Sequence, residues 1–332
     1  RAYRKSLSNV DVFEASARFV APGVVEAGGS LLTSDRIVVA AGARPMVPSI
    51  PGLADVPFHT SDTIMRIDHL PEHLIVLGGG FIACEFAHVF RSLGSKVTIV
   101  NRSGALLRAE DADISRRFTE LMAQRVDLVT GAHIDAVSSS DGSIAIDVSV
   151  NGDARRIEGD CLLLALGRVS NADQLDAAAG GIDTDSNGFI RVDQFGRTSA
   201  PGVWALGDIN GRHQLKHMAN GEARVVRHNL THPDDLRVFD PRPAPHAVFS
   251  SPQVGAVGLT EEQARQSGGR YCVAVQEYAG SAYGWAMEDQ TSFCKLIGDP
   301  VSRTLLGAHV IGPQASLLVQ QLVQGLHLGN TV

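Results

Sequence analysis

The chain has 332 residues, of which 44% are hydrophobic and 20% are charged, values typical of a water-soluble globular protein with two or three domains. A formal net charge of -7 argues against nucleic acid as a partner. No apolar run has the length of a membrane-spanning helix, and no secretory signal opens the sequence. The cysteines lie far apart and form no CxxC or metal-ligand pair: Cys84, Cys161, Cys272 and Cys294. We therefore expect a cytoplasmic protein without a metal site, a membrane partner or a nucleic-acid partner.

The first part of the chain predicts short strands that end in a turn of small residues. The expected strands are 18–20, 24–26, 30–33 and 36–40. Gly42 lies in the small-residue turn after the last of them, where a planar group or a backbone can approach closely. Prolines then predict an extended linker, and Thr60 to Asp62 is expected to cap a short helix from Thr63 to Ile67.

The glycine-rich stretch from residue 74 to 87 is the strongest functional signal. Four apolar residues predict a buried parallel strand, and the three glycines after them predict a turn. The apolar residues that come next recur at helical spacing and predict a helix, which is followed by a strand at 97–100. This is the context that a dinucleotide-binding fingerprint requires. Gly78 would permit the tight turn, Gly80 would let a pyrophosphate approach the backbone, and Ala83 is the third small position. The alternative is a tight turn without a ligand.

The end of the next strand indicates which nucleotide is preferred. It carries no carboxylate of the kind that binds the ribose hydroxyls of NAD. Arg102 is present instead, and Arg108 follows six residues later. Since a guanidinium binds a phosphate with two parallel hydrogen bonds, these residues favour NADPH over NADH. Two solvated surface arginines are the alternative.

Further elements divide the rest of the chain. A helix is predicted at 114–124, strands at 127–130, 134–137 and 144–150, a hairpin at Asn151-Gly152, and an apolar run at 161–166 before Gly167. Strands at 189–192 and 203–206 follow, with Asp208 at the carboxyl edge of the second, and then a helix at 216–230.

The C-terminal part predicts a separate sheet. Its expected strands are 247–249, 254–258, 271–276, 293–297 and 305–311. Thr260 and Gln263 form a capping box at the start of one helix. A second helix, 315–326, has a largely apolar face that we expect to be part of the core.

Three stretches together resemble the pyridine nucleotide-disulfide oxidoreductases: Val38 to Pro45, Gly78 to Ala87, and Thr198 to Asp208. Residues 164–171 are similar to the family's second glycine motif, although Ser170 replaces its usual proline, and residues 248–260 resemble the start of its dimerisation domain. The resemblance covers nearly the whole chain in the right order. Residues 59–67, 167–171 and 282–288 look most like the mycothione reductases of this family.

The resemblance implies an α/β fold with two Rossmann-like nucleotide-binding domains, for FAD and NADPH, and an α+β dimerisation domain. It implies FAD-domain segments at 1–69 and 168–240, an NADPH domain at 70–167 and a dimerisation domain at 241–332. The implied FAD residues are Gly42, Asp208 and His217. The implied NADPH residues are Gly78, Gly80, Ala83, Glu85, Arg102, Arg108 and Gly167, with Glu85 beside the nicotinamide and Phe81 covering the flavin.

Three family motifs are absent from these 332 residues: the N-terminal GxGxxG, the redox CxxxxC and the C-terminal His-Pro-x-x-x-x-Glu. We therefore expect part of a longer homodimeric enzyme that reduces a small-molecule disulfide, with mycothione as the expected substrate. This chain alone would lack the catalytic residues of the disulfide step and be inactive. The alternatives are an NAD-dependent dihydrolipoamide dehydrogenase and a non-catalytic nucleotide-binding or dimerising module.

Overall fold

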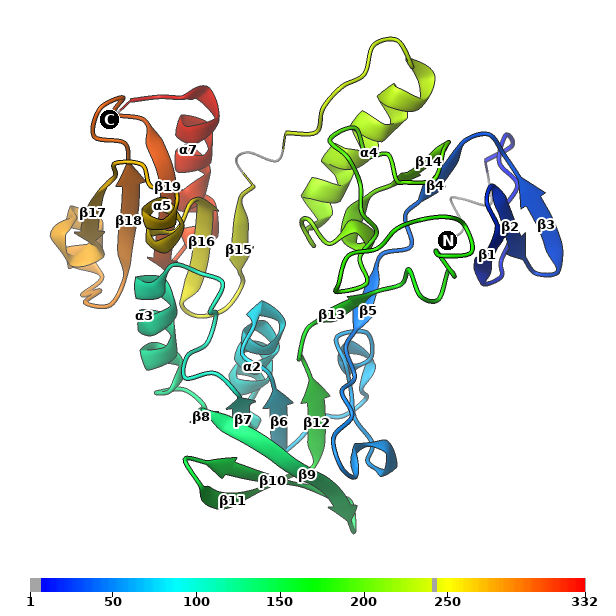
Figure 1. Ribbon diagram of the computed structural model, residues 1–332. Helices are drawn as coiled ribbons and strands as arrows, with labels where there is room; N and C mark the ends of the chain where they lie inside the picture. The colour runs from blue at the N-terminus through cyan, green and yellow to red at the C-terminus, as the bar shows by residue number, and fades with distance from the viewer. Residues whose placement is uncertain (1–6, 241–243, 332) are drawn as a thin grey trace. The chain divides into compact units, whose positions relative to one another are not determined.

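The computed structural model describes residues 7–240 and 244–331 (Figure 1). The chain forms two compact units, one from residues 1–44 and 168–241, the other from 45–167 and 242–332. The predicted domain boundaries at 69/70, 167/168 and 240/241 remain predictions, and the last of them adjoins residues outside the described ranges. None of the helices in the described ranges combines the length and hydrophobicity needed to cross a membrane.

The first unit contains a small parallel strand pair and an antiparallel sheet. The sheet consists of β1 (Ala17–Ala21), β2 (Val24–Ala27) and β3 (Ser30–Thr33). β4 (Ile37–Val39) pairs in parallel with β14 (Val203–Ala205), although more than 160 residues separate them in sequence. β5 (Ala43–Pro45) pairs with β13 (Arg168–Ser170), and η3 (Gly207–Asn210) and α4 (Lys216–Thr231) follow β14.

Two sequence predictions of secondary structure are wrong. Residues 189–192 form no strand, because Ile190 makes only an isolated bridge with Thr184 and donates its N–H to the carbonyl of Ile209. The predicted helix at 63–67 is the single 3₁₀ turn η2 (Ile64–Arg66). It has no side-chain cap, and the backbone carbonyl of Thr60 accepts the N–H of Ile64 at 3.0 Å.

The second unit contains the predicted glycine-turn nucleotide fold. Four parallel strands pair in the order β12 (Cys161–Leu164), β6 (His73–Leu77), β7 (Lys96–Asn101) and β8 (Asp127–Thr130). Helices α2 (Phe81–Leu93) and α3 (Ala112–Met122) pack on one face of the sheet, in a core that contains Leu74 and Val76, whereas Ile75 and Leu77 on the other face belong to a second core with residues 132–148. This explains the continuous apolar run of β6, since a strand covered on both faces has no polar side.

An antiparallel hairpin extends this fold. β9 (Ala132–Ser140) pairs with β10 (Ser143–Val150), which pairs with β11 (Asp153–Gly159). Asn151 and Gly152 both have positive φ, 54° and 92°, as a two-residue hairpin turn of the mirror-image type requires. The predicted hairpin is confirmed. The unit also contains η1 (Leu53–Asp55) in the segment before the glycine turn.

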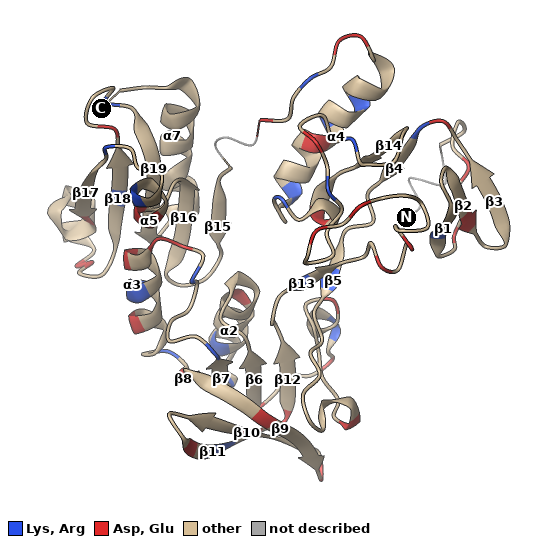
Figure 2. Cartoon of the chain, in the orientation of Figure 1, with Lys and Arg blue, Asp and Glu red and all other residues tan. Residues whose placement is uncertain are grey.

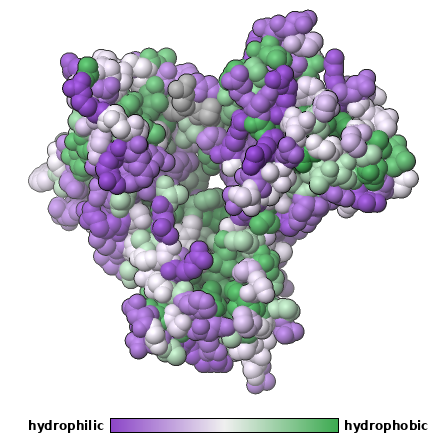
Figure 3. All heavy atoms as spheres, in the orientation of Figure 1, coloured by the Kyte–Doolittle hydropathy of each residue, from purple (hydrophilic) through white to green (hydrophobic). Residues whose placement is uncertain are grey.

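The C-terminal sheet has five antiparallel strands in the order β15 (His246–Val248), β16 (Gln253–Gly258), β19 (Leu305–Gly312), β18 (Phe293–Gly298) and β17 (Cys272–Glu277). Between β16 and β18 the chain forms α5 (Glu261–Gln266), η4 (Tyr278–Gly280) and α6 (Ala282–Ala286). The capping box of Thr260 and Gln263 is present as predicted. On the face drawn in Figure 3, hydrophilic and hydrophobic residues are interspersed over the surface.

Helix α7 (Ala315–Leu328) packs against β16 and β19. Gly255 lies directly under it, because a Cβ there would be 2.5 Å from the carbonyl oxygen of Ala315. Only Ala315 and Val319 of this helix are buried, whereas Leu317 is 68% exposed. The prediction that this apolar face belongs to the core is therefore wrong for Leu317 and Leu318, whereas Leu322 and Leu326 pack, partly buried, against the core of the sheet.

Candidate functional site

The glycine turn between β6 and α2 combines one closely packed position with one open position. Gly78 has φ of +127°, and a Cβ there would lie 2.2 Å from the carbonyl oxygen of Ala165. Gly80 is the N-cap of α2, no side chain caps this helix end, and a Cβ at Gly80 would meet no atom within 4 Å. Ala83 is fully buried beneath the turn. The helix N-terminus thus faces free space in which a phosphate can approach backbone N–H groups.

The segment after β7, residues 102–111, is called the cofactor loop here because it contains Arg102 and Arg108. The side-chain amide of Asn101 donates to the carbonyls of Ser103 at 3.1 Å and Ala105 at 2.9 Å. The N–H of Leu107 donates to the carbonyl of Gly79 at 2.7 Å. These bonds fasten the loop to the glycine turn. Both arginines are exposed, and the Nη1 of Arg108 donates to Ser103 Oγ at 3.1 Å.

Asn101 is a residue that sequence reasoning missed. It is only 8% exposed, and a Cβ added at Gly79 would lie 2.6 Å from its side chain. This contact explains the middle glycine of the turn, for which the sequence offered no specific reason. The available signal was a polar residue at the carboxyl end of a parallel strand, where ligands and turns are fixed.

Glu85 lies on α2 and connects the nucleotide fold to the C-terminal sheet. Its Oε1 accepts the N–H of Phe249 at 2.8 Å, just after β15. Burial raises the pKa of Glu85, and the hydrogen bond from Phe249 only partly offsets this effect. Phe81 is 45% exposed at the start of the same helix. The other predicted residue of this unit, Gly167, has φ of +121° and a Cβ position 3.4 Å from Met46 Cε.

The predicted FAD residues all lie in the first unit. Gly42 follows β4 and Asp208 follows β14; because the two strands are parallel neighbours, their carboxyl ends meet at one edge. A Cβ at Gly42 would meet no atom within 4 Å. The Nε of Arg168 lies 4.0 Å from an oxygen of Asp208 and is buried without a hydrogen-bond partner. An open glycine and an unpaired buried donor fit a polar ligand, and His217 is in the first turn of α4 beyond this edge.

Glu222 of α4 fixes the turn that contains Asp208, and sequence reasoning missed it too. Its buried carboxylate accepts the N–H of Gly207 at 2.5 Å and the amide of Asn210 at 3.1 Å. These hydrogen bonds therefore connect α4 to the turn that contains Asp208. A glutamate in mid-helix is ordinarily exposed, so no distinctive sequence pattern indicates this role.

The cysteines are not arranged as a redox pair. All four are free, and Cys84 and Cys161 are buried core residues. Burial raises the pKa of the Cys161 thiol to about 11, and the thiol pKa of Cys84 is raised further. A thiolate is therefore disfavoured at both positions.

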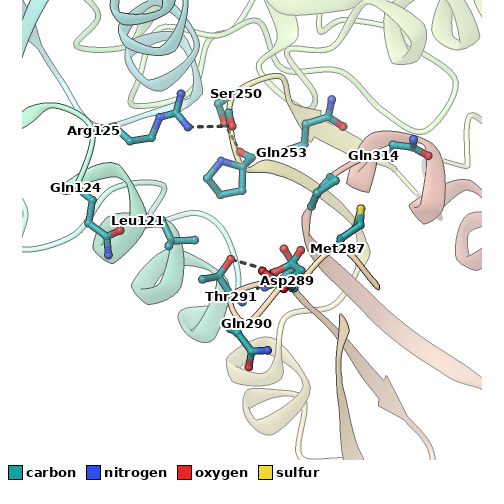
Figure 4. A pocket seen from close by; sticks show the side chains of 15 residues that line it. Leu121, Gln124, Arg125, Ser250, Gln253, Met287, Asp289, Gln290, Thr291 and Gln314 are labelled. Carbon is teal, nitrogen blue, oxygen red and sulfur yellow. Dashed lines mark hydrogen bonds between the residues drawn. The ribbon is translucent and has the colours of Figure 1, made fainter. Parts of the chain in front are cut away.

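A cavity of about 810 Å³ lies between the end of α3 and loops of the C-terminal sheet (Figure 4). Most of the residues that line it are of polar type, and Arg125 donates from Nη1 to Ser251 Oγ at 3.2 Å. It contains none of the residues predicted to bind a cofactor. The predicted nucleotide site is therefore the glycine turn and cofactor loop, and not this cavity.

Two family models match successive parts of the chain. A family model described as pyridine nucleotide-disulphide oxidoreductase matches residues 2–223, and the model of its dimerisation domain matches 244–332. Mycothione reductase of Mycobacterium tuberculosis is 45% identical over 99% of this chain and 73% of its own length. Dihydrolipoyl dehydrogenase of Vibrio cholerae is 30% identical over 97% of this chain and 69% of its own length. The solved structure of the HOCl-induced flavoprotein disulfide reductase RclA from Escherichia coli has a TM-score of 0.88 and 30% identity, covering 99% of this chain and 75% of that chain.

Proposed function

This chain belongs to the pyridine nucleotide-disulphide oxidoreductase family, and from that premise we propose that it forms part of an NADPH-dependent mycothione reductase. The family uses FAD and a pyridine nucleotide and acts on disulfides, and its fold is the expected α/β arrangement with nucleotide-binding and dimerisation domains. The substrate is proposed from the 45% identity to mycothione reductase, against 30% to dihydrolipoyl dehydrogenase.

The observation that carries the NADPH preference is the arrangement at the end of β7. The strand-end residue Asn101 is a neutral amide whose NH₂ group donates to the carbonyls of Ser103 and Ala105, so this position offers no carboxylate for the ribose hydroxyls of NAD. Arg102 follows directly and is exposed. A cation without a carboxylate at this position suits a 2′-phosphate. The same arrangement argues against the NAD-dependent dihydrolipoamide dehydrogenase alternative.

Each group of residues has a proposed task. FAD, when bound, supplies the redox chemistry that links the nicotinamide to the disulfide. Gly42 and Asp208 would hold the flavin cofactor by close approach and hydrogen bonding, with His217 at the α4 N-terminus favouring negative charge near it. Glu85, fixed by the N–H of Phe249, would orient the nicotinamide amide. The glycine turn would hold the pyrophosphate.

We also propose that the enzyme is a homodimer that associates through residues 244–332, where the dimerisation-domain model matches. Its proposed location is the cytoplasm, because all four cysteines are unpaired, as is usual in a reducing compartment. A non-catalytic module remains the alternative for a chain without the redox cysteines.

The decisive experiment is Arg102→Glu in the full-length enzyme, with Arg155→Glu as a control at an exposed arginine of β11. We expect NADPH to lose about 2 kcal/mol of binding free energy while NADH improves, because the change replaces a phosphate ligand with a repelling charge. The control should alter neither. Steady-state kinetics with mycothione, glutathione disulfide and lipoamide then identify the substrate. Equal use of both nucleotides before and after the change would contradict the proposal.

A further inference from the structure

The cofactor loop ends at the boundary between the nucleotide fold and the C-terminal sheet. Its inner part is fixed by α3, since Ser115 donates to the carbonyl of Leu106 at 2.6 Å and Thr119 accepts the N–H of Leu106 at 3.0 Å. Its last residue, Asp111, is the N-cap of α3 and accepts the N–H of Asp113 at 3.1 Å. The loop therefore cannot shift without displacing Asp111.

Asp111 is held by residues of the C-terminal sheet. Lys295 of β18 has a side chain only 1% exposed, and its Nζ lies 2.8 Å from Asp111 Oδ1. The same ammonium contacts Asp113 Oδ2 at 2.7 Å and Glu261 Oε2 at 2.6 Å. The other oxygen of Asp111 accepts the N–H of Glu261 at 3.0 Å. These four residues are called the Lys295 network. Figure 2 shows charged residues of both signs along α3.

A buried ammonium with three carboxylates is costly to remove from water and is a weak source of stability. Of its three partners, Asp111 ends the cofactor loop, Asp113 lies in the first turn of α3 and Glu261 begins α5, so the ammonium joins the loop end to the C-terminal sheet. Burial disfavours the charged Lys295, but the three carboxylates outweigh it and raise its pKa above the ordinary value. Lys295 is thus protonated throughout the physiological pH range.

We propose that Lys295, through Asp111, is a positioning residue for the pyridine nucleotide: the dimerisation domain fixes the cofactor loop so that its arginines meet the 2′-phosphate. The inference rests on the proposed use of NADPH. It makes Lys295 a determinant of nucleotide specificity, although it lies in a different domain from the nucleotide site and nearly 190 residues beyond Arg108 in sequence.

The test uses the full-length enzyme and three variants: Asp111→Asn, Lys295→Met and the double variant. Asparagine caps a helix as well as aspartate does, so Asp111→Asn removes the charge and keeps the cap. If Lys295→Met alone fails to fold, the double variant is used in its place, because it removes Asp111 and Lys295 together and leaves neither as the unpaired charge of the other. Val319→Ala is the control, because Val319 is 1% exposed on the buried side of α7 and takes no part in the network.

Binding is measured by calorimetric titration with adenosine 2′,5′-bisphosphate and 5′-AMP, which differ only in the 2′-phosphate, and with NADH. We expect the preference for the 2′-phosphate ligand to fall at least about fivefold in the network variants. Val319→Ala should lower the melting temperature and leave that preference unchanged. An unchanged preference in folded network variants overturns the proposal.

The proposed function and the positioning role can fail separately. If the wild type binds the two adenosine ligands equally, NADPH use is wrong. The positioning role is then judged by NADH, whose dissociation constant should still rise at least about fivefold in the network variants and not in Val319→Ala. An unchanged NADH affinity in that case also overturns it.

Discussion

Single residues in the glycine turn have separate and testable tasks. Gly80 has an ordinary φ of -83° and open space around its Cβ position, so Gly80→Ala should fold without strain. A ligand pyrophosphate would have to share that space with the new methyl group. We expect nucleotide affinity to fall by at least about tenfold, a loss of about 1.4 kcal/mol, with an unchanged melting temperature. Titration with NADPH and thermal unfolding measure the two effects.

Gly79→Ala is the matched comparison. Its methyl group would lie 2.6 Å from the Asn101 side chain, so the amide that fastens the cofactor loop has to move. This variant should lower both the melting temperature and the affinity. If Gly80→Ala lowered the melting temperature as much as Gly79→Ala, the space at Gly80 would not be the open position described above.

His246 gives the second unit a pH dependence. Its Nε2 lies 2.8 Å from Glu110 Oε1, and the other oxygen of Glu110 is buried without a hydrogen-bond partner. Burial disfavours the charged imidazole, but the hydrogen bond and charge of Glu110 outweigh it, so the pKa of His246 is raised from 6.5. The charge of His246 in turn contributes to lowering the pKa of His309, mainly lowered by burial.

A raised folded-state pKa means that the stabilisation is fully present below pH 6.5 and is lost as the pH rises through the raised value. We expect the free energy of unfolding to decrease by less than about 1 kcal/mol between roughly pH 6 and pH 8, since His246 is partly exposed. His246→Gln removes this titration. Denaturant unfolding across that range should therefore show a smaller decrease for the variant, and parallel curves would refute the assignment.

At the level of residues, the sequence indicated those whose role is local. Gly78, Gly80 and Arg102 could be proposed as site residues because strand, turn and loop are consecutive. Glu222 and Lys295 were not, since their partners lie 12 or more residues away in another element. A buried charge has no periodic signature in one sequence, and only the fold brings its partners together.

Among the secondary-structure elements, α5 is short and depends on its cap. Thr260 Oγ1 accepts the N–H of Gln263 at 3.2 Å, and the Gln263 side chain accepts the N–H of Thr260 at 2.9 Å. Thr260→Ala should lower the free energy of unfolding by about 1 kcal/mol. Because Glu261 follows directly and contacts Lys295, nucleotide specificity should also weaken slightly. Chemical denaturation is the measurement, with Thr231→Ala at the end of α4 as a control outside this unit.

Sequence patterns located the elements well where neighbouring elements cover them. The strand from His73 to Leu77 and the helix after it were predicted from apolar spacing, because both are enclosed by the same chain. Residues 189–192 have strand-like composition but no partner strand, and propensity alone does not supply one. For α7 the apolar pattern was correct, but it cannot tell which chain covers Leu317.

For the whole molecule, the exposed side of α7 bears on the proposed homodimer. Leu317, Leu318 and Leu328 are 68%, 38% and 61% exposed, in the region matched by the dimerisation-domain model. Apolar residues at these exposures are costly in water unless a partner covers them, and a two-fold interface would use the same patch on both chains. An obligate interface is typically on the order of 2,000 Å² or more.

Leu317→Lys should therefore convert the dimer toward monomer without destabilising the fold, because the side chain makes no core contact in its own chain. Light scattering on the full-length protein across a dilution series measures the mass, and thermal unfolding at fixed concentration checks the fold. Leu31→Lys on β3 is the control, since Leu31 is 69% exposed but lies in the other unit. We expect the dimer dissociation constant to rise by about tenfold or more for Leu317→Lys, since a buried lysine at the centre of an interface loses about 1.4 kcal/mol or more. The control should remain dimeric; an equal shift for both variants, or a wild type that is monomeric at every concentration, would exclude α7 as the interface.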